Sequence, residues 1–219
     1  MTSVLEWISD NLKKRIVFDL DNTLLMWEDK YIFALEKVLD DLHVEYTKEE
    51  MINYDNHIYL YEHLYNNYNI DDYMNFTRKY FNSYIPDEFY DMLISYQEEC
   101  YTIDEELIST LKYLSSKYDL VVLTNWFTKT QIGRLKNSKV LEYFTFVSGG
   151  DERVLKPDLH AFLIVFDKYK PSECIMVGDS FRCDIEPAIK LGMDYYWITD
   201  KLDSNYNTIE NVYKLKDIL

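Results

Sequence analysis

Five short, continuous apolar runs recur along this chain, and they constrain its fold more than any other feature. They span 15–18, 120–123, 145–148, 174–177 and 195–198. Continuous rather than alternating runs of this length are typical of strands buried on both faces of a parallel sheet. Between the later runs, residues of helical period occupy 105–117, 129–135, 159–168 and 184–191. This alternation predicts an α/β fold with a doubly wound, Rossmann-like parallel sheet.

The interval between the first two runs is far longer than a crossover helix requires. Helical periodicity divides it into four stretches, at 31–42, 48–65, 71–84 and 87–100. Thr47 and Glu50 predict a capping box at the start of the second stretch. We therefore expect an inserted α-helical cap domain over 27–102, and an α/β core domain formed by 1–26 and 103–219.

Residues 1–14 precede the first run and carry apolar side chains at helical spacing. We expect a helix docked on the sheet, with a dimer contact as the alternative, so monomer and homodimer both stay open. The N-terminus has no basic segment followed by a long apolar core, and no stretch approaches transmembrane length. Three cysteines without ligand-like spacing predict neither a disulfide framework nor a zinc site. A reduced, cytoplasmic setting without membrane association is the expectation.

The formal charge of -16 limits the class of partner. Nucleic-acid polymers and anionic membrane surfaces are bound mainly through Lys and Arg, so neither is an expected partner. A small anionic substrate remains possible, because one metal ion and one lysine can reverse the sign of a pocket locally.

The first apolar run ends in two carboxylates, Asp19 and Asp21, spaced one residue apart. Like charges this close at the end of a buried strand resist joint ionisation unless something neutralises them. A divalent cation is the simplest answer. Because the backbone is expected to turn here, one of the two groups could offer its backbone carbonyl, which leaves a carboxylate free for chemistry.

Polar residues also follow three later strands. Thr124 and Asn125 come after the second strand, Lys156 stands before Pro157 at an expected helix start, and Asp179 and Asp184 flank a strand-to-helix turn. Each short motif is common by itself. In an open α/β sheet, however, ligands bind beyond the carboxyl ends of the strands. The ordered series therefore predicts one site built from four segments.

These residues resemble the motifs of the haloacid dehalogenase-like (HAD) hydrolase superfamily, in the subgroup with a helical cap between the first and second motifs. The resemblance rests on Asp19-Leu20-Asp21-Asn22-Thr23-Leu24, Thr124-Asn125, Lys156-Pro157, and Gly178-Asp179-Ser180 with Asp184. Their spacing agrees over nearly the whole chain, apart from the first fourteen residues.

The resemblance implies a set of roles. Asp19 would be the nucleophile that forms an aspartyl-phosphate, and Asp21 the general acid and base. Mg2+ would be held by Asp19, the backbone carbonyl of Asp21, and Asp179. Thr124, Asn125 and Lys156 would contact the phosphoryl group, and Asp184 would orient a metal-bound water or Lys156.

The implied function is a Mg2+-dependent phosphatase acting on a small phosphorylated metabolite of the nucleotide or sugar phosphate class. Dehalogenase members lack an acid at the position of Asp21, because a departing halide needs no proton. A phosphomutase and a non-catalytic regulatory or binding protein are the alternatives. The sequence does not identify the substrate, since specificity resides in the cap and loops.

Overall fold

A parallel six-stranded sheet forms the centre of the computed structural model, which describes residues 13–201 and 203–219. The helix expected over 1–14 therefore lies outside the described residues, apart from its last two positions. The strands are β1 (Arg15–Phe18), β2 (Asp119–Leu123), β3 (Phe146–Ser148), β4 (Cys174–Gly178), β5 (Asp194–Ile198) and β6 (Thr208–Ile209). Their order is β3-β2-β1-β4-β5-β6. The predicted α/β fold is confirmed, and β6 is an addition whose two residues carry no periodic signal.

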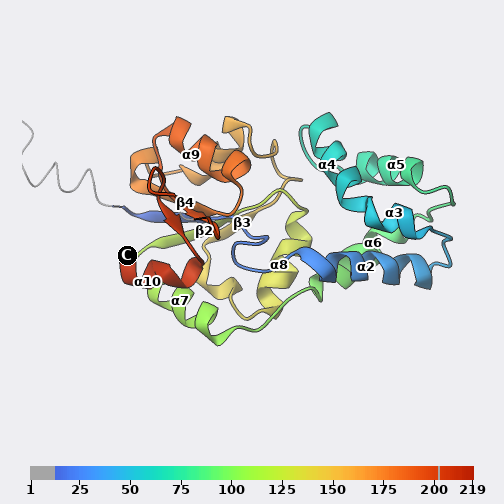
Figure 1. Ribbon diagram of the computed structural model, residues 1–219, viewed down its shortest axis with the longest axis horizontal. Helices are drawn as coiled ribbons and strands as arrows, with labels where there is room; N and C mark the ends of the chain where they lie inside the picture. Colours follow the sequence, from blue (N-terminus) through green and yellow to red (C-terminus); the bar gives the residue numbers. More distant parts are fainter. Residues whose placement is uncertain (1–12, 202) are drawn as a thin grey trace, which may run out of the picture.

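Helices cover both faces of the sheet (Figure 1). On one face lie α7 (Glu105–Ser115), α8 (Thr128–Asn137) and α10 (Leu215–Ile218), and on the other lie η2 (Leu159–Val165) and α9 (Glu186–Leu191). Successive residues of β1 alternate between them: Ile16 and Phe18 pack in the first cluster, Val17 in the second. Burial on both faces explains why the strand runs are continuously apolar.

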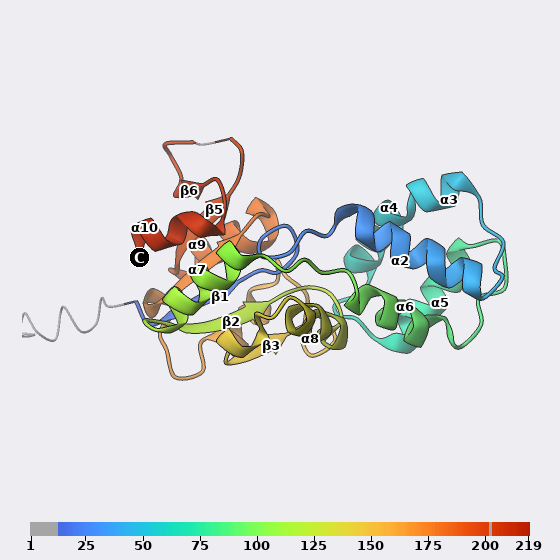
Figure 2. The ribbon, with the colours of Figure 1, turned by 90° about the horizontal axis from the view of Figure 1, so that it is seen from below.

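The inserted helices gather at one end of the sheet, as two perpendicular views show (Figures 1 and 2). They are α2 (Glu28–Asp41), α3 (Lys48–Ile52), α4 (Tyr54–Leu64), α5 (Ile70–Tyr80) and α6 (Phe89–Glu98). They bury a largely separate aromatic-rich cluster, which Trp126 and Phe127 of the sheet region join. The helical insertion between the first two strands is confirmed. The domain bounds 27–102 and 103–219 stay a prediction.

Several helices differ from the sequence expectation. The predicted capping box of Thr47 and Glu50 is present, but the helix expected over 48–65 is broken at Asn53 into α3 and α4. The expected helix at 159–168 is the 3₁₀ helix η2, whose N-cap is Asp158. Pro157 therefore precedes the helix instead of occupying its first turn, and the Lys156–Pro157 peptide bond is cis.

The remaining short elements are the 3₁₀ helices η1 (Leu141–Tyr143), η3 (Pro171–Glu173) and η5 (Val212–Lys214), and the π-helical turn η4 (Phe181–Ile185). The helix expected over 184–191 thus begins as a π turn and continues as α9. Among the described residues, no helix combines the length and apolar character needed to cross a bilayer.

Because β1 lies between β2 and β4, the strand order reverses at β1. The chain after β2 continues outward to β3, whereas the chain after β4 continues outward to β5 on the opposite side. The connections consequently diverge at the carboxyl ends of β1 and β4. A crevice at such a divergence is where open α/β sheets bind their ligands.

Candidate active site

Asp19 and Asp21 leave β1 in different directions. The Asp19 N–H donates to the Val177 carbonyl at 2.9 Å, so the parallel pairing with β4 extends one residue beyond β1. The chain then turns sharply, with Asn22 at a φ of 58°. This turn breaks strand alternation, and the two carboxylates consequently meet different partners.

Asp179 and Asp184 come from the turn that follows β4. The Asp179 N–H donates to Thr23 Oγ1 at 3.1 Å, which ties this turn to the loop after β1. The Ser180 N–H donates to Asp184 Oδ2 at 3.2 Å. A Cβ on Gly178 would lie 2.4 Å from that same oxygen. Glycine is therefore required here for the close approach of Asp184 to the strand end.

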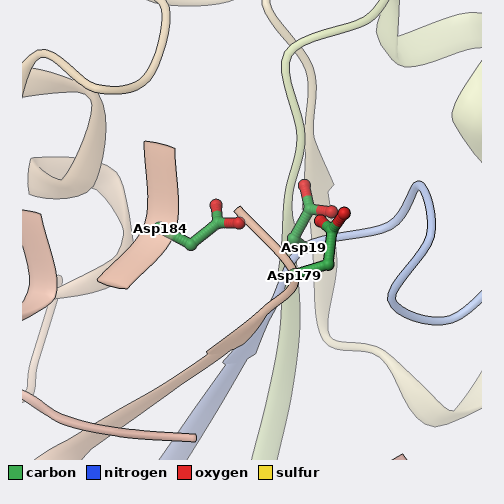
Figure 3. Close-up of side chains that lie close together, drawn as sticks. All are labelled: Asp19, Asp179 and Asp184. Carbon is green, nitrogen blue, oxygen red and sulfur yellow. The ribbon is translucent and has the colours of Figure 1, made fainter. Parts of the chain in front are cut away.

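Asp19, Asp179 and Asp184 form an acidic cluster (Figure 3). Each offers one carboxylate oxygen, and these oxygens lie within 4.8 Å of one another. Burial, reinforced by the neighbouring Asp19, raises the pKa of Asp179 to about 6. Carboxylate oxygens are the donors that Mg2+ prefers. The cluster thus fits a divalent cation, whose charge would offset both the burial of these carboxylates and their mutual repulsion.

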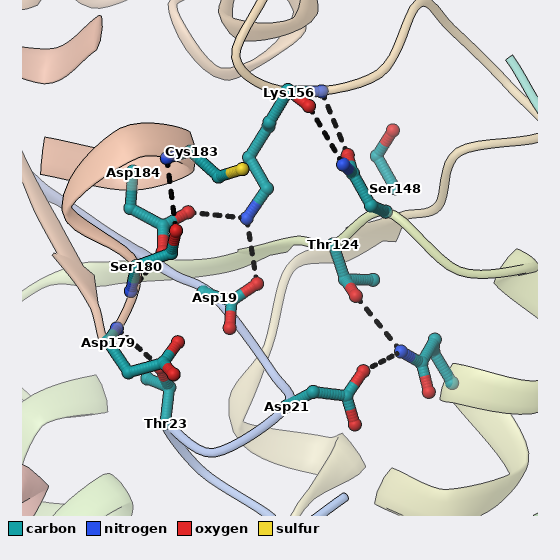
Figure 4. Close-up of polar contacts among 12 residues, drawn as sticks. Asp19, Asp21, Thr23, Thr124, Ser148, Lys156, Asp179, Ser180, Cys183 and Asp184 are labelled. Atoms are coloured by element: carbon teal, nitrogen blue, oxygen red, sulfur yellow. Dashed lines mark hydrogen bonds and ion pairs between the residues drawn. The ribbon is translucent and has the colours of Figure 1, made fainter. Parts of the chain in front are cut away.

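Lys156 places a positive charge between two carboxylates of the acidic cluster (Figure 4). Its Nζ donates to Asp19 Oδ1 at 2.7 Å and to Asp184 Oδ1 at 2.6 Å. Burial alone would lower the pKa of Lys156, but Asp184 and Asp19 together outweigh it and hold the pKa above its ordinary value. Burial raises the pKa of Asp184 to about 7, against the opposing effect of Lys156.

Asn125 holds the backbone of Lys156. Its Nδ2 donates to the Lys156 carbonyl at 2.9 Å, and its Oδ1 accepts from the Lys156 N–H at 2.8 Å. Thr124 lies beside it with its N–H donating to the Ser148 carbonyl at 3.0 Å. Thr124 Oγ1 accepts from Gln131 Nε2 at 2.9 Å, so the Thr124 hydroxyl proton stays available for a ligand.

Asp21 is held by two residues of α8 that the sequence analysis did not identify, Gln131 and Arg134. Gln131 Nε2 donates to Asp21 Oδ2 at 2.7 Å, and Arg134 Nη1 pairs with Asp21 Oδ1. Burial raises the pKa of Asp21, and Arg134 opposes it. Gln131, Arg134 and Leu135 share the buried face of α8. Two polar residues on the same stripe as a leucine are the signal that could have found them.

A cavity of about 260 Å³ lies over these groups. The predicted residues that line it are Asp19, Asp21, Thr124, Asn125, Lys156, Asp179 and Asp184. All the predicted site residues therefore border one space. The inserted helices contribute Ile58 and Glu62, which the sequence analysis missed. Both lie on one face of α4, where no sequence signal separates Glu62 from the other acids of the cap.

Three curated relatives match part of the chain. The HAD-hydrolase YfnB of Bacillus subtilis is 26% identical over 126 residues, covering 55% of this chain and 53% of YfnB. N-acylneuraminate-9-phosphatase of Rattus norvegicus is 29% identical over 110 residues, 44% of each chain. Pyrimidine 5'-nucleotidase PynA of Streptococcus pneumoniae is 26% identical over 137 residues, 59% of this chain and 57% of PynA. The matches span about half the length of these relatives.

Solved structures match nearly the whole chain. YfnB of Bacillus subtilis bound to magnesium has a TM-score of 0.74 at 21% identity, covering 95% of this chain and 99% of that one. A HAD phosphatase from Thermococcus onnurineus has a TM-score of 0.64 at 28% identity, covering 94% and 97%. L-2-haloacid dehalogenase from Xanthobacter autotrophicus has a TM-score of 0.71 at 13% identity, covering 94% and 98%.

A HAD phosphatase and a dehalogenase thus share this fold. The likenesses to YfnB and to the dehalogenase, at 21% and 13% identity, show the fold alone. The chain also matches the sequence profile of the haloacid dehalogenase-like hydrolases over residues 16–198, from β1 to β5. That stretch contains every residue of the acidic cluster. The chain belongs to the haloacid dehalogenase-like hydrolase family.

Proposed function

We propose that this protein is a Mg2+-dependent phosphatase that hydrolyses a small phosphate monoester through an aspartyl-phosphate on Asp19. The observation that carries the proposal is a further carboxylate, Asp21, which lines the same cavity as the three carboxylates of the acidic cluster. A departing alkoxide needs a proton, whereas a departing halide does not. Asp21 therefore favours phosphoryl transfer over the dehalogenation that some relatives perform.

In the proposed reaction, a carboxylate oxygen of Asp19 attacks phosphorus while the bond from phosphorus to the ester oxygen breaks. Asp21 gives its proton to the departing oxygen. A water molecule then attacks the aspartyl-phosphate, Asp21 takes a proton from it, and phosphate leaves with Asp19 restored.

The other polar groups stabilise and orient the phosphoryl group. Mg2+, bound by Asp19, Asp179 and the Asp21 carbonyl, would offset the repulsion between the anionic nucleophile and the anionic phosphate. Lys156 and the Thr124 hydroxyl would contact the phosphoryl oxygens, as would the Asn125 backbone N–H. Asp184 would keep the Lys156 ammonium oriented, which its 2.6 Å hydrogen bond supports.

We further propose that 27–102 works as a cap over a core of 1–26 and 103–219. Trp27, Ile58 and Glu62 reach the same cavity as the residues that follow the strands. Closure of such a cap would exclude water and add contacts to the leaving group. A small substrate is consistent with a cavity of about 260 Å³.

The test is hydrolysis of p-nitrophenyl phosphate with and without Mg2+. Wild-type protein should release phosphate only with the metal, and Asp19→Asn should abolish release. An Asp217→Asn variant, at an exposed position of α10, is the matched control and should behave as wild type. Equal turnover by Asp19→Asn and wild type would refute the assigned nucleophile. Isomerisation of a bisphosphorylated sugar without free phosphate would identify the phosphomutase alternative instead.

A further inference from the structure

The inserted helices present one described carboxylate, that of Glu62, to the cavity. Glu62 lies on α4, one turn after Ile58, and is half-buried. Its Oε1 accepts from the Tyr68 hydroxyl at 3.0 Å. Burial raises its pKa, which Tyr68, Lys156 and Asn125 oppose. A carboxylate that receives one hydroxyl donor keeps further acceptor sites for a ligand.

The described lining of the cavity is strongly unbalanced in charge. Its carboxylates are Asp19, Asp21, Glu62, Asp179 and Asp184, and its described cation is Lys156. Lys156 is already paired with two of those carboxylates. The positive charges of a bound divalent cation, Lys156 and Arg134, which pairs with Asp21, are fewer than the negative charges of the phosphoryl group and the four aspartates. No positive charge is therefore left over to neutralise Glu62. A second anionic group on the substrate would therefore meet a negative charge and no free described cation.

We infer that Glu62 selects the leaving group. It favours phosphate esters whose alcohol part carries hydroxyl or amino donors, and it rejects esters that carry a carboxylate or a second phosphate. This inference rests on the proposed phosphatase function and adds a substrate class to it. The apolar walls near Glu62, formed by Trp27, Ile58 and Trp126, suit the carbon skeleton of such an alcohol.

Rejection follows from ordinary electrostatics. A buried charge with no partner is costly, and like charges held together are costlier still in a site of low dielectric constant. A hydroxyl or ammonium group instead donates a charge-assisted hydrogen bond to the carboxylate. Glu62 thus attracts esters that carry hydroxyl or amino donors and repels esters that carry a carboxylate or a second phosphate.

Two matched pairs of probes test the inference. In the first pair, glycerol phosphate carries a hydroxymethyl group where phosphoglycerate carries a carboxylate. In the second pair, phosphoethanolamine carries an aminomethyl group where phosphoglycolate carries a carboxylate. Wild type should show kcat/KM at least about tenfold higher for the first member of each pair. Glu62→Gln should narrow both ratios by about tenfold, and Glu62→Lys should invert them.

Glu88→Gln is the matched control, because Glu88 is an exposed carboxylate at the start of α6, outside the cavity lining. Its ratios should equal those of wild type. Thermal melting followed by circular dichroism verifies that each variant folds. If Glu62→Lys does not fold, the comparison of Glu62→Gln with wild type is sufficient to test the inference.

Ratios that stay unchanged in Glu62→Gln would overturn the inference, as would a wild-type preference for the carboxylated probes. Turnover of p-nitrophenyl phosphate by the same wild-type preparation would then show that the proposed phosphatase function stands. Absence of phosphate release by wild type from every probe in the presence of Mg2+ would overturn both the inference about Glu62 and the proposed phosphatase function.

Discussion

Arg134 is fully buried, and besides Gln131 of its own helix its hydrogen bonds reach the connection after β1 and the end of the inserted helices. It pairs with the Asp21 carboxylate, its Nε donates to the Cys100 carbonyl at 2.9 Å, and its Nη2 donates to the Met26 carbonyl at 3.2 Å. Met26 and Cys100 stand where the chain leaves and re-enters the sheet region. A single guanidinium thus joins the proposed acid to both connections of the inserted helices.

Replacing Arg134 by methionine should lower the free energy of unfolding by about 2–3 kcal/mol, because the Asp21 carboxylate, whose side chain is 20% exposed, loses its charged partner and keeps the hydrogen bond from Gln131. Urea denaturation measures this. Arg78→Met is the matched control. Because Arg78 pairs with the exposed Asp87, removing the Arg78 side chain should lower the free energy of unfolding by about 1 kcal/mol or less.

Adding Asp21→Asn to Arg134→Met should recover part of the lost stability, since the unpaired charge disappears with it. A double variant no more stable than Arg134→Met would contradict the explanation.

The sequence was informative about residues that directly follow a strand. Asp19, Thr124 and Asp179 were placed together because parallel strands end at one edge of a sheet. Glu62 was missed because it lies within a helix, where only tertiary packing decides which face meets the cavity. Arg134 also lies within a helix, but it shares a buried stripe with Leu135, which could have indicated its position.

Helices α4 and α5 are joined by stacked rings, with His57 at their centre. The His57 ring lies 4.1 Å from the rings of both Phe76 and Tyr80, measured between centroids. Burial in these surroundings lowers the pKa of His57 to about 4. The two helices therefore pack around a neutral imidazole.

Packing of α4 on α5 should consequently weaken in acid. The folded pKa of His57 lies below the value of about 6.5 in an unfolded chain, so the unfolded state binds more protons between these values. The stability that neutral His57 contributes is complete above about pH 6.5 and is lost as the pH falls towards 4. After allowance for solvent near the ring, we expect a loss of about 1–2 kcal/mol between pH 7 and pH 5.

Urea denaturation of His57→Phe at both pH values checks this expectation, since phenylalanine retains the stacking and does not titrate. The variant should lose less stability than wild type over the interval. His160→Gln, which changes an exposed histidine, should match wild type. Equal losses in wild type and His57→Phe would rule out His57 as the origin.

At the level of elements, periodicity identified strands and most helices, but local geometry changed the details. Asn53 divides α3 from α4 where the apolar pattern runs on without interruption. The stretch at 159–165 winds as a 3₁₀ helix, although its apolar spacing is compatible with an α-helix. Periodicity reports which residues are buried, and hydrogen bonding at the ends decides how the backbone winds.

Over the whole molecule, the charge of -16 and the acidic cluster act in the same direction. Negative charges repel one another throughout the fold, and the repulsion is concentrated where Asp19, Asp179 and Asp184 converge. General salt screens the exposed charges, because the Debye length falls to about 8 Å at physiological ionic strength. A cluster that is mostly buried is screened much less, so its relief requires a cation bound at the site.

MgCl2 should therefore raise the melting temperature more than NaCl of the same ionic strength. A ligand at 100 times its Kd stabilises the folded state by about 2.7 kcal/mol, which corresponds to about 5–10 °C for a chain of this size. Asp179→Asn should remove the difference between the two salts, whereas the exposed-site control Asp217→Asn should keep it. Differential scanning calorimetry of the three proteins provides the measurement. If MgCl2 and NaCl shifted the melting temperature of wild type equally, the acidic cluster would not be a magnesium site, and the closeness of Asp19 to Asp184 would be due to Lys156, which pairs with both.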